Sequence, residues 1–89
     1  MEIVYSILEA SKQGALKTHI MFKCNLNSRQ VQIYVQFLVD KGLLVRERVA
    51  PSPKLEYKTS ERGLRYIRAY ETLLDLVGGS HPVRIQMRA

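Results

Sequence analysis

Residues 26–44, "LNSRQVQIYVQFLVDKGLL", carry the clearest structural pattern in this chain of 89 residues. Apolar residues recur there at the i, i+3, i+4, i+7 spacing of an amphipathic helix, namely Val31, Tyr34, Val35 and Leu38. Ser28 can cap the first turn, because its hydroxyl accepts hydrogen bonds from free backbone amides. Gly42 then stands where glycine relieves a left-handed C-terminal cap. The pattern predicts a helix over residues 28–41.

Two shorter helices are predicted before this one. Helical spacing of apolar residues over 2–13 predicts the first, and Gly14 ends it. The second covers 17–23, with Ile20 and Met21 facing inward. The intervening "CNLN" breaks the pattern because asparagine favours turns and tolerates a left-handed backbone. Its Leu26 is expected to be buried between the two helices.

The chain changes period after Gly42. "LLVRERV", residues 43–49, alternates as a strand does. We expect one face of this strand to carry Leu43 and Val45, and the other to carry Arg46 and Arg48.

A second strand follows a short, stiff connection. "APSPK" (50–54) holds two prolines and predicts an exposed loop tip. "LEYKT" (55–59) alternates again, with Leu55 and Tyr57 expected to face inward. The two strands predict a hairpin.

A fourth helix is predicted from a cap at Thr59 or Ser60 to about Val77. It carries two apolar stripes, one of Leu64, Ile67, Tyr70 or Glu71, and Leu74, and one of Tyr66, Tyr70, Leu73 and Val77. A core of this size covers one stripe, so we expect the second to pair with a second copy in a homodimer. The alternative is that both stripes are buried within one chain. Residues 78–89 are expected to form either a flexible basic tail or a short extra strand.

The order helix, helix, turn, helix, hairpin, helix predicts a mainly α fold with a small β-hairpin (α+β). A helix-turn-helix followed by a hairpin is a winged helix-turn-helix, here with an appended C-terminal helix. We expect one domain over 1–77, with the dimerisation helix at about 60–77.

The charge distribution favours an anionic partner. The net charge is +6, and residues 46–68 hold seven of the 14 basic residues against three of the eight acids. Nucleic acid is the first candidate, followed by an acidic protein or a membrane surface. No apolar run is long enough to cross a bilayer. A lone cysteine, Cys24, and a first segment that does not resemble a secretory signal predict a cytoplasmic protein. The chain lacks phosphate-loop, nucleophile and metal-ligand motifs, so we expect no cofactor and no enzyme.

The predicted helix at 28–41 has a second stripe, rotated away from the buried one. It consists of Arg29, Gln32, Ile33 and Gln36 and contains no acid. Arginine can bind a guanine edge, glutamine can pair with adenine, and isoleucine can contact a thymine methyl group. The alternative is an ordinary solvated helix face, since Arg and Gln are good helix formers.

Other basic residues are candidates for contacts with DNA phosphates. Lys17 and Thr18 begin the second predicted helix, where a phosphate can be held; the alternative is that Thr18 only caps the helix. The predicted wing at 46–58 carries Arg46, Arg48, Lys54 and Lys58. The alternative here is a solvated hairpin whose charged edge deters aggregation.

"GALKTHIMFKCNLNSRQVQIYVQFLVDKGLL" and "YKTSERGLRYIRAYETL" resemble the archaeal winged-helix family of predicted transcriptional regulators. That family is related to small archaeal DNA-binding proteins that dimerise through a C-terminal coiled coil. The resemblance covers residues 1 to about 77. It implies DNA binding by the helix at 28–41 and the wing, and dimerisation by the last helix, which is shorter than a long coiled-coil arm.

Two hypotheses follow. The first is a homodimeric regulator that binds double-stranded DNA, and the second is a winged-helix module that binds protein within a larger, transcription-related assembly. Salt distinguishes them, because binding through phosphates weakens steeply with salt and an apolar interface hardly changes.

Overall fold

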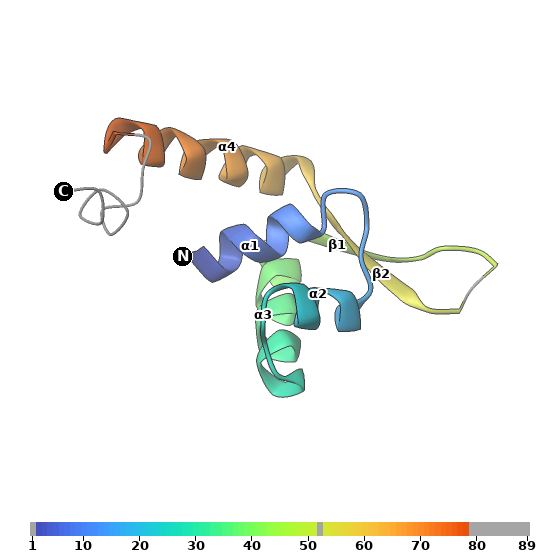
Figure 1. Cartoon of the computed structure of the whole chain (residues 1–89). Coiled ribbons are helices and arrows are strands. Elements are labelled where there is room, and N and C mark those ends of the chain that lie inside the picture. Colours follow the sequence, from blue (N-terminus) through green and yellow to red (C-terminus); the bar gives the residue numbers. More distant parts are fainter. Residues whose placement is uncertain (1, 52, 79–89) are drawn as a thin grey trace.

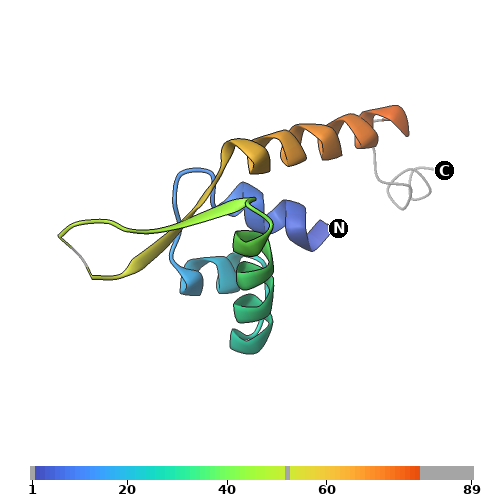
Figure 2. The same ribbon diagram turned by 180° about the vertical axis from the view of Figure 1, so that it is seen from behind.

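The computed structural model describes residues 2–51 and 53–78 and confirms the predicted winged-helix architecture. The elements are α1 (Glu2–Ala10), α2 (Lys17–Lys23), α3 (Ser28–Asp40), β1 (Leu44–Arg48), β2 (Leu55–Thr59) and α4 (Glu61–Leu76). In both views the hairpin extends from one end of the molecule and the far half of α4 from the other (Figure 1 and Figure 2). The prediction for the tail concerns residues that, from 79 onward, lie outside the described part of the chain.

The core lies where α1, α2 and α3 meet the base of the hairpin. Every helix and both strands contribute to it, through Val4, Ile7, Leu8, Ile20, Val31, Val35, Leu38, Leu44, Tyr57 and Ile67. Leu26 is partly buried and packs against this core, as the sequence predicted. Asn25 beside it has a φ of +57°, the left-handed backbone expected in the turn between α2 and α3.

The first helix ends at Ala10, three residues earlier than predicted. Ser11 is fully buried, and its carbonyl accepts hydrogen bonds from the amides of Gly14 and Thr59, each at 3.0 Å. That carbonyl therefore serves a turn and the end of β2 in place of a continuing helix. Gly14 has a φ of +97° and leads the chain to Ala15, whose backbone pairs with Tyr57 of β2.

The cap of α3 is Asn27, and the prediction of Ser28 was wrong by one residue. Asn27 Oδ1 accepts from the Gln30 amide at 2.8 Å, and Gln30 Oε1 accepts from the Asn27 amide at 2.9 Å. This reciprocal pair is a capping box, in which two free amides are satisfied together. At α4, Ser60 is the cap: its Oγ accepts from the Gly63 amide at 3.0 Å.

The hairpin faces differ from the prediction in β1. Arg46 pairs with Tyr57 and Arg48 with Leu55, and residues directly opposite in an antiparallel ladder point to the same face. The arginines therefore share the face of the buried Tyr57, while Val45 is 46% exposed on the other face. Leu55 lies on the predicted inner face but is exposed at 36%, since the hairpin extends past the helices there.

The backbone before β1 determines which of its side chains point toward the core. The Leu43 amide donates to the Leu38 carbonyl at 2.9 Å, and the Leu43 carbonyl accepts from the Ser60 amide at 3.1 Å. Leu43 thus belongs to the end of α3 and the strand begins at Leu44, which is buried. A shift of one residue transfers every side chain of a strand to the opposite face.

Candidate nucleic-acid interface

The stripe predicted to read bases lies along the outer face of α3. Its four members are all exposed: Arg29, Gln32, Ile33 and Gln36. Ile33 is 58% exposed, a large fraction for a β-branched apolar residue in the middle of a helix. One part of the prediction was wrong, because Asp40 follows one turn after Gln36 and places an acid at the end of the stripe.

Gln36 is held at both ends of its amide. Arg46 Nη2 donates to Gln36 Oε1 at 2.9 Å, and Gln36 Nε2 donates to Asp40 Oδ1 at 2.9 Å. A carboxamide has two N–H donors and two acceptor positions, so one of each stays available. The network fixes which end of the amide is which and connects the stripe to β1.

Gln32 has a similar neighbour from α2. Lys17 Nζ donates to Gln32 Oε1, which places the start of α2 beside the stripe. Thr18 is exposed in the first turn of α2. The alternative that Thr18 caps this helix was wrong, since the cap position is Leu16 and no side chain bonds there.

The four basic residues of the wing lie in different positions. Arg46 lies over the Tyr57 ring, with its Cζ 5.7 Å from the ring centroid, and turns toward α3. Arg48 Nη1 donates to the Pro53 carbonyl at 2.7 Å and so braces the two sides of the tip. Lys54 is exposed near that tip, and Lys58 is exposed on the opposite face from Arg46.

The four residues predicted to form the dimer contact lie in two different settings on α4. Tyr66 is partly buried against the core, and Tyr70 stacks on Tyr5 of α1 with ring centroids 4.6 Å apart. Leu73 and Val77 are 61% and 55% exposed.

The contact of α1 with α4 also changes a titration. Tyr5 Oη donates to Glu71 Oε2 at 2.9 Å. That hydrogen bond, with some desolvation, raises the pKa of Tyr5 to about 12. Burial also raises the pKa values of Cys24 and Tyr66. Within the described residues Arg62, Arg65 and Arg68 form no ion pair with Glu61 or Glu71.

Sequence reasoning missed two exposed features. Phe22 on α2 is 78% exposed. It follows directly after the inward-facing Ile20 and Met21, and this spacing could have indicated that Phe22 lies on the other side of the helix. The second is a pocket between α1, the end of α3 and the start of α4. Its residues are far apart in the sequence, and no local pattern marks it.

Two further kinds of site were searched for. Over residues 2–51 and 53–78, no cluster of three His, Cys, Asp or Glu side chains is placed to hold a metal ion. None of the described helices combines the length and apolar character that a membrane span requires.

The fold and this exposed helix face define a winged helix-turn-helix protein. Residues 1–77 match the family model described as "Winged helix-turn-helix", and the chain belongs to that family. This confirms the winged-helix part of the predicted resemblance; the archaeal and coiled-coil parts stay predictions.

Two solved structures share the fold. The crystal structure of Sso10a-2, a DNA-binding protein from Sulfolobus solfataricus, superposes with a TM-score of 0.76 at 18% identity, over 98% of this chain and 90% of that one. A transcriptional regulator of the MarR family from Rhodococcus sp. RHA1 gives 0.72 at 23% identity, over 97% of this chain and 67% of that one. A search of curated proteins found no match.

Proposed function

We propose that this protein is a transcriptional regulator that binds duplex DNA as a homodimer. In this proposal α3 enters the major groove and the basic wing at 46–58 contacts the phosphates. The observation that supports it most is the exposed stripe of α3, whose two glutamines each accept a hydrogen bond from a cation, Lys17 or Arg46. Both solved neighbours are described as DNA-binding or regulatory proteins, which agrees with a binding role and not a catalytic one.

The stripe has the chemistry of base recognition. Arg29 can donate two hydrogen bonds to a guanine edge, and Ile33 can contact a thymine methyl group. Gln36 keeps one donor and one acceptor after its contacts to Arg46 and Asp40, the pair that an adenine edge requires. Gln32, whose oxygen accepts one hydrogen bond from Lys17, keeps the same capacity.

The phosphate contacts are assigned to Lys17, Thr18, Arg46, Arg48, Lys54 and Lys58. Lys17 and Arg46 now donate to neutral amide oxygens, and charged phosphate oxygens are the stronger acceptors. On DNA these two cations therefore exchange the glutamine for a phosphate and free its oxygen for a base. Arg48 stiffens the wing tip through Pro53 as well as adding charge.

The homodimer is assigned to α4. Leu73 and Val77, with Leu76 at 76% exposure, leave an apolar surface at the far end of this helix. A second copy covers it by two-fold symmetry, since the same patch is then buried on both chains. Tyr66 and Tyr70 contribute only the parts of their rings that α1 and the core leave exposed. Light scattering after size exclusion tests this, and Leu73→Asp is expected to give a monomer that remains folded; a dimer retained in Leu73→Asp would refute the contact.

Fluorescence anisotropy with a random-sequence duplex of about 20 base pairs, at about 50 mM and about 200 mM salt, tests DNA binding. The ten assigned Lys and Arg side chains of the homodimer, five from each protomer, predict a slope of log affinity against log salt of about −9. Arg46→Gln removes one contact from each protomer and should reduce the slope by about 2, whereas Arg68→Gln, on the exposed surface of α4, should not change it.

Absence of binding at low salt would refute the proposal. It would favour the second candidate, a protein-binding module that uses Phe22 and Ile33, which are 78% and 58% exposed. An apolar interface of that kind should be nearly independent of salt.

A further inference from the structure

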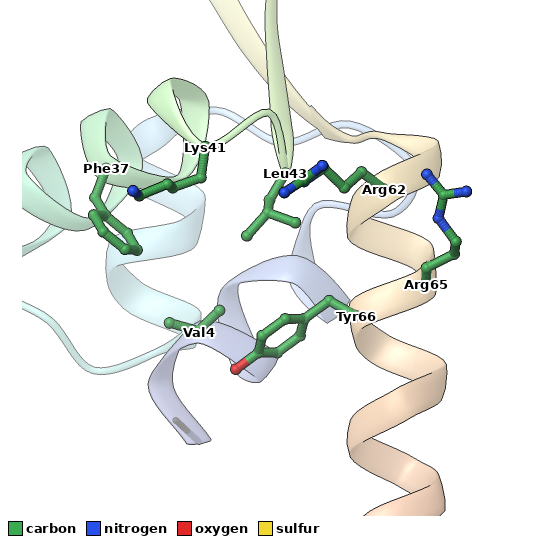
Figure 3. Close-up of a pocket in the computed structure, with 7 residues that line it drawn as sticks. All are labelled: Val4, Phe37, Lys41, Leu43, Arg62, Arg65 and Tyr66. Carbon is green, nitrogen blue, oxygen red and sulfur yellow. The ribbon is translucent and has the colours of Figure 1, made fainter.

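The pocket at the junction of α1, α3 and α4 has a volume of about 560 Å³. This lies in the range of roughly 300–1,000 Å³ that small-molecule sites occupy in proteins. Its walls are Val4, Phe37, Lys41, Leu43, Arg62, Arg65 and Tyr66 (Figure 3). It lies away from the DNA-contacting residues assigned above, since none of them lines it.

The floor of the pocket is apolar. Val4 and Tyr66 face each other across it, and Leu43 lies between α3 and α4 (Figure 3). Phe37 is 47% exposed although it belongs to the wall, so a large aromatic surface there is uncovered in the single chain. When an apolar group displaces water from such a surface, the free energy of the system decreases.

The rim of the pocket carries three cations and no carboxylate. Arg62 reaches from α4 toward Leu43, Lys41 lies over the Phe37 ring with Nζ 5.7 Å from its centroid, and Arg65 stands at the α4 edge (Figure 3). Within residues 2–51 and 53–78 none of the three forms an ion pair. Cations without a carboxylate partner attract a bound anion.

We propose that this pocket binds a small carboxylate with a flat apolar body. The body fills the space between Val4, Phe37 and Tyr66, and the carboxylate is held by Arg62, whose planar guanidinium can donate two parallel hydrogen bonds to it. Lys41 and Arg65 add charge at the rim. A neutral apolar ligand would leave the cations unpaired, and a hydrophilic anion would leave the aromatic wall uncovered.

The site also has a consequence for regulation, and this part rests on the proposed function. Phe37 and Lys41 belong to α3, whose outer face carries the base-reading stripe, whereas Arg62 and Tyr66 belong to α4. An occupant therefore contacts both the recognition helix and the dimerisation helix. A ligand that prefers one relative position of these helices shifts DNA affinity by that preference.

The binding step is tested without DNA, so its failure leaves the proposed DNA binding untouched. Naphthoate is titrated into the full chain while the backbone amide signals are followed by NMR, and the neutral analogue naphthamide is titrated in parallel. The expected result is saturable shifts at Val4, Phe37, Leu43 and Tyr66, with naphthamide bound about tenfold more weakly because it lacks the charge.

Arg62→Gln and its control Arg68→Gln separate a specific site from the general charge of α4. Each removes one exposed arginine of the same helix, but only Arg62 lines the pocket. Naphthoate affinity should fall about tenfold in Arg62→Gln and stay the same in Arg68→Gln. Lys41→Gln, on a different helix, provides a second variant and should also weaken binding.

Three results would overturn the proposal. The first is equal binding of naphthoate and naphthamide, and the second is an equal loss in Arg62→Gln and Arg68→Gln. The third is a set of pocket signals that shift on dilution but do not respond to naphthoate, which would show that a second copy of the chain occupies the site.

Discussion

The two faces of α3 use the same backbone for different purposes. The inner face packs Val31, Val35 and Leu38 at 2% exposure or less. The outer face is exposed along its length, and its polar side chains bond to Lys17, Arg46 and Asp40. Burial stabilises the fold through the inner face, whereas exposed hydrogen bonds contribute little net stability. The comparison teaches that fold and proposed function can be altered separately on one helix.

Leu38→Ala should have the largest effect, and on stability alone. The side chain is fully buried, so its loss removes apolar contacts and leaves a cavity. We expect a decrease of about 2–5 kcal/mol in the free energy of unfolding, measured by urea denaturation. DNA affinity of the fraction that remains folded should be unchanged. A loss below about 1 kcal/mol would mean that α3 does not anchor the core.

Gln36→Ala should show the opposite behaviour. It removes an exposed side chain, so the free energy of unfolding should change by no more than about 0.5 kcal/mol. Affinity for a preferred site, selected from a random-sequence pool, should fall by about 1–3 kcal/mol because one base contact is lost. Affinity for unrelated duplexes should hardly change. An equal loss on every sequence would assign Gln36 to phosphate contact or to the positioning of Arg46.

Asn27→Ala and Ser28→Ala test the start of the same helix. Asn27 caps α3, so its replacement by alanine should lower the free energy of unfolding by about 1 kcal/mol. Ser28 is the first helical residue and makes no capping bond, so its replacement should be nearly neutral. Thermal unfolding of the two variants gives the difference directly. A larger loss of stability in Ser28→Ala than in Asn27→Ala would show that Ser28 is the cap.

The smallest expected effect concerns pH and the contact between α1 and α4. The pKa of Tyr5 is raised from 10.0 to about 12 in the folded chain, first of all by its hydrogen bond to Glu71. A raised pKa means that folding favours the protonated phenol, so its contribution is complete below pH 10 and is lost as the pH rises toward 12. Tyr5→Phe should therefore lower stability slightly at pH 8 and make it less dependent on pH between 10 and 12. An identical alkaline decline in wild type and Tyr5→Phe would show that this phenol is not responsible.

The sequence predicted most of the fold because its signals are local. Apolar spacing identified α3, and Gly42, with a φ of +75°, ended it as expected. The face of β1 was predicted wrongly, because the start of that strand depends on two hydrogen bonds of Leu43: its amide donates to Leu38 of α3, and its carbonyl accepts from Ser60, the cap of α4. Both faces of this strand carry apolar and charged residues, so its own sequence does not determine which face is buried.

The candidate site was predictable only in part for a similar reason. Helical spacing alone places Arg29, Gln32, Ile33 and Gln36 on one stripe. The bonds that hold Gln36 and Gln32 need Arg46 and Lys17, ten and fifteen residues away along the chain. The pocket is lined by both Val4 and Arg62, and only the packing of α1 against α4 brings these residues to one site.

Ser60 forms the joint between α3 and α4, that is, the point where the end of one helix contacts the start of the other. Its Oγ donates to the Gly42 carbonyl at 2.7 Å and accepts from the Gly63 amide at 3.0 Å, and its amide donates to the Leu43 carbonyl. Gly63 allows this closeness, because a Cβ there would lie 2.4 Å from the Leu43 oxygen. Two hydrogen bonds of Ser60, to Gly42 and to Leu43, therefore connect the end of α3 to the start of α4. In the proposed homodimer this joint sets the distance between the two recognition helices, and with it the spacing of the half-sites, about 34 Å for one turn of DNA.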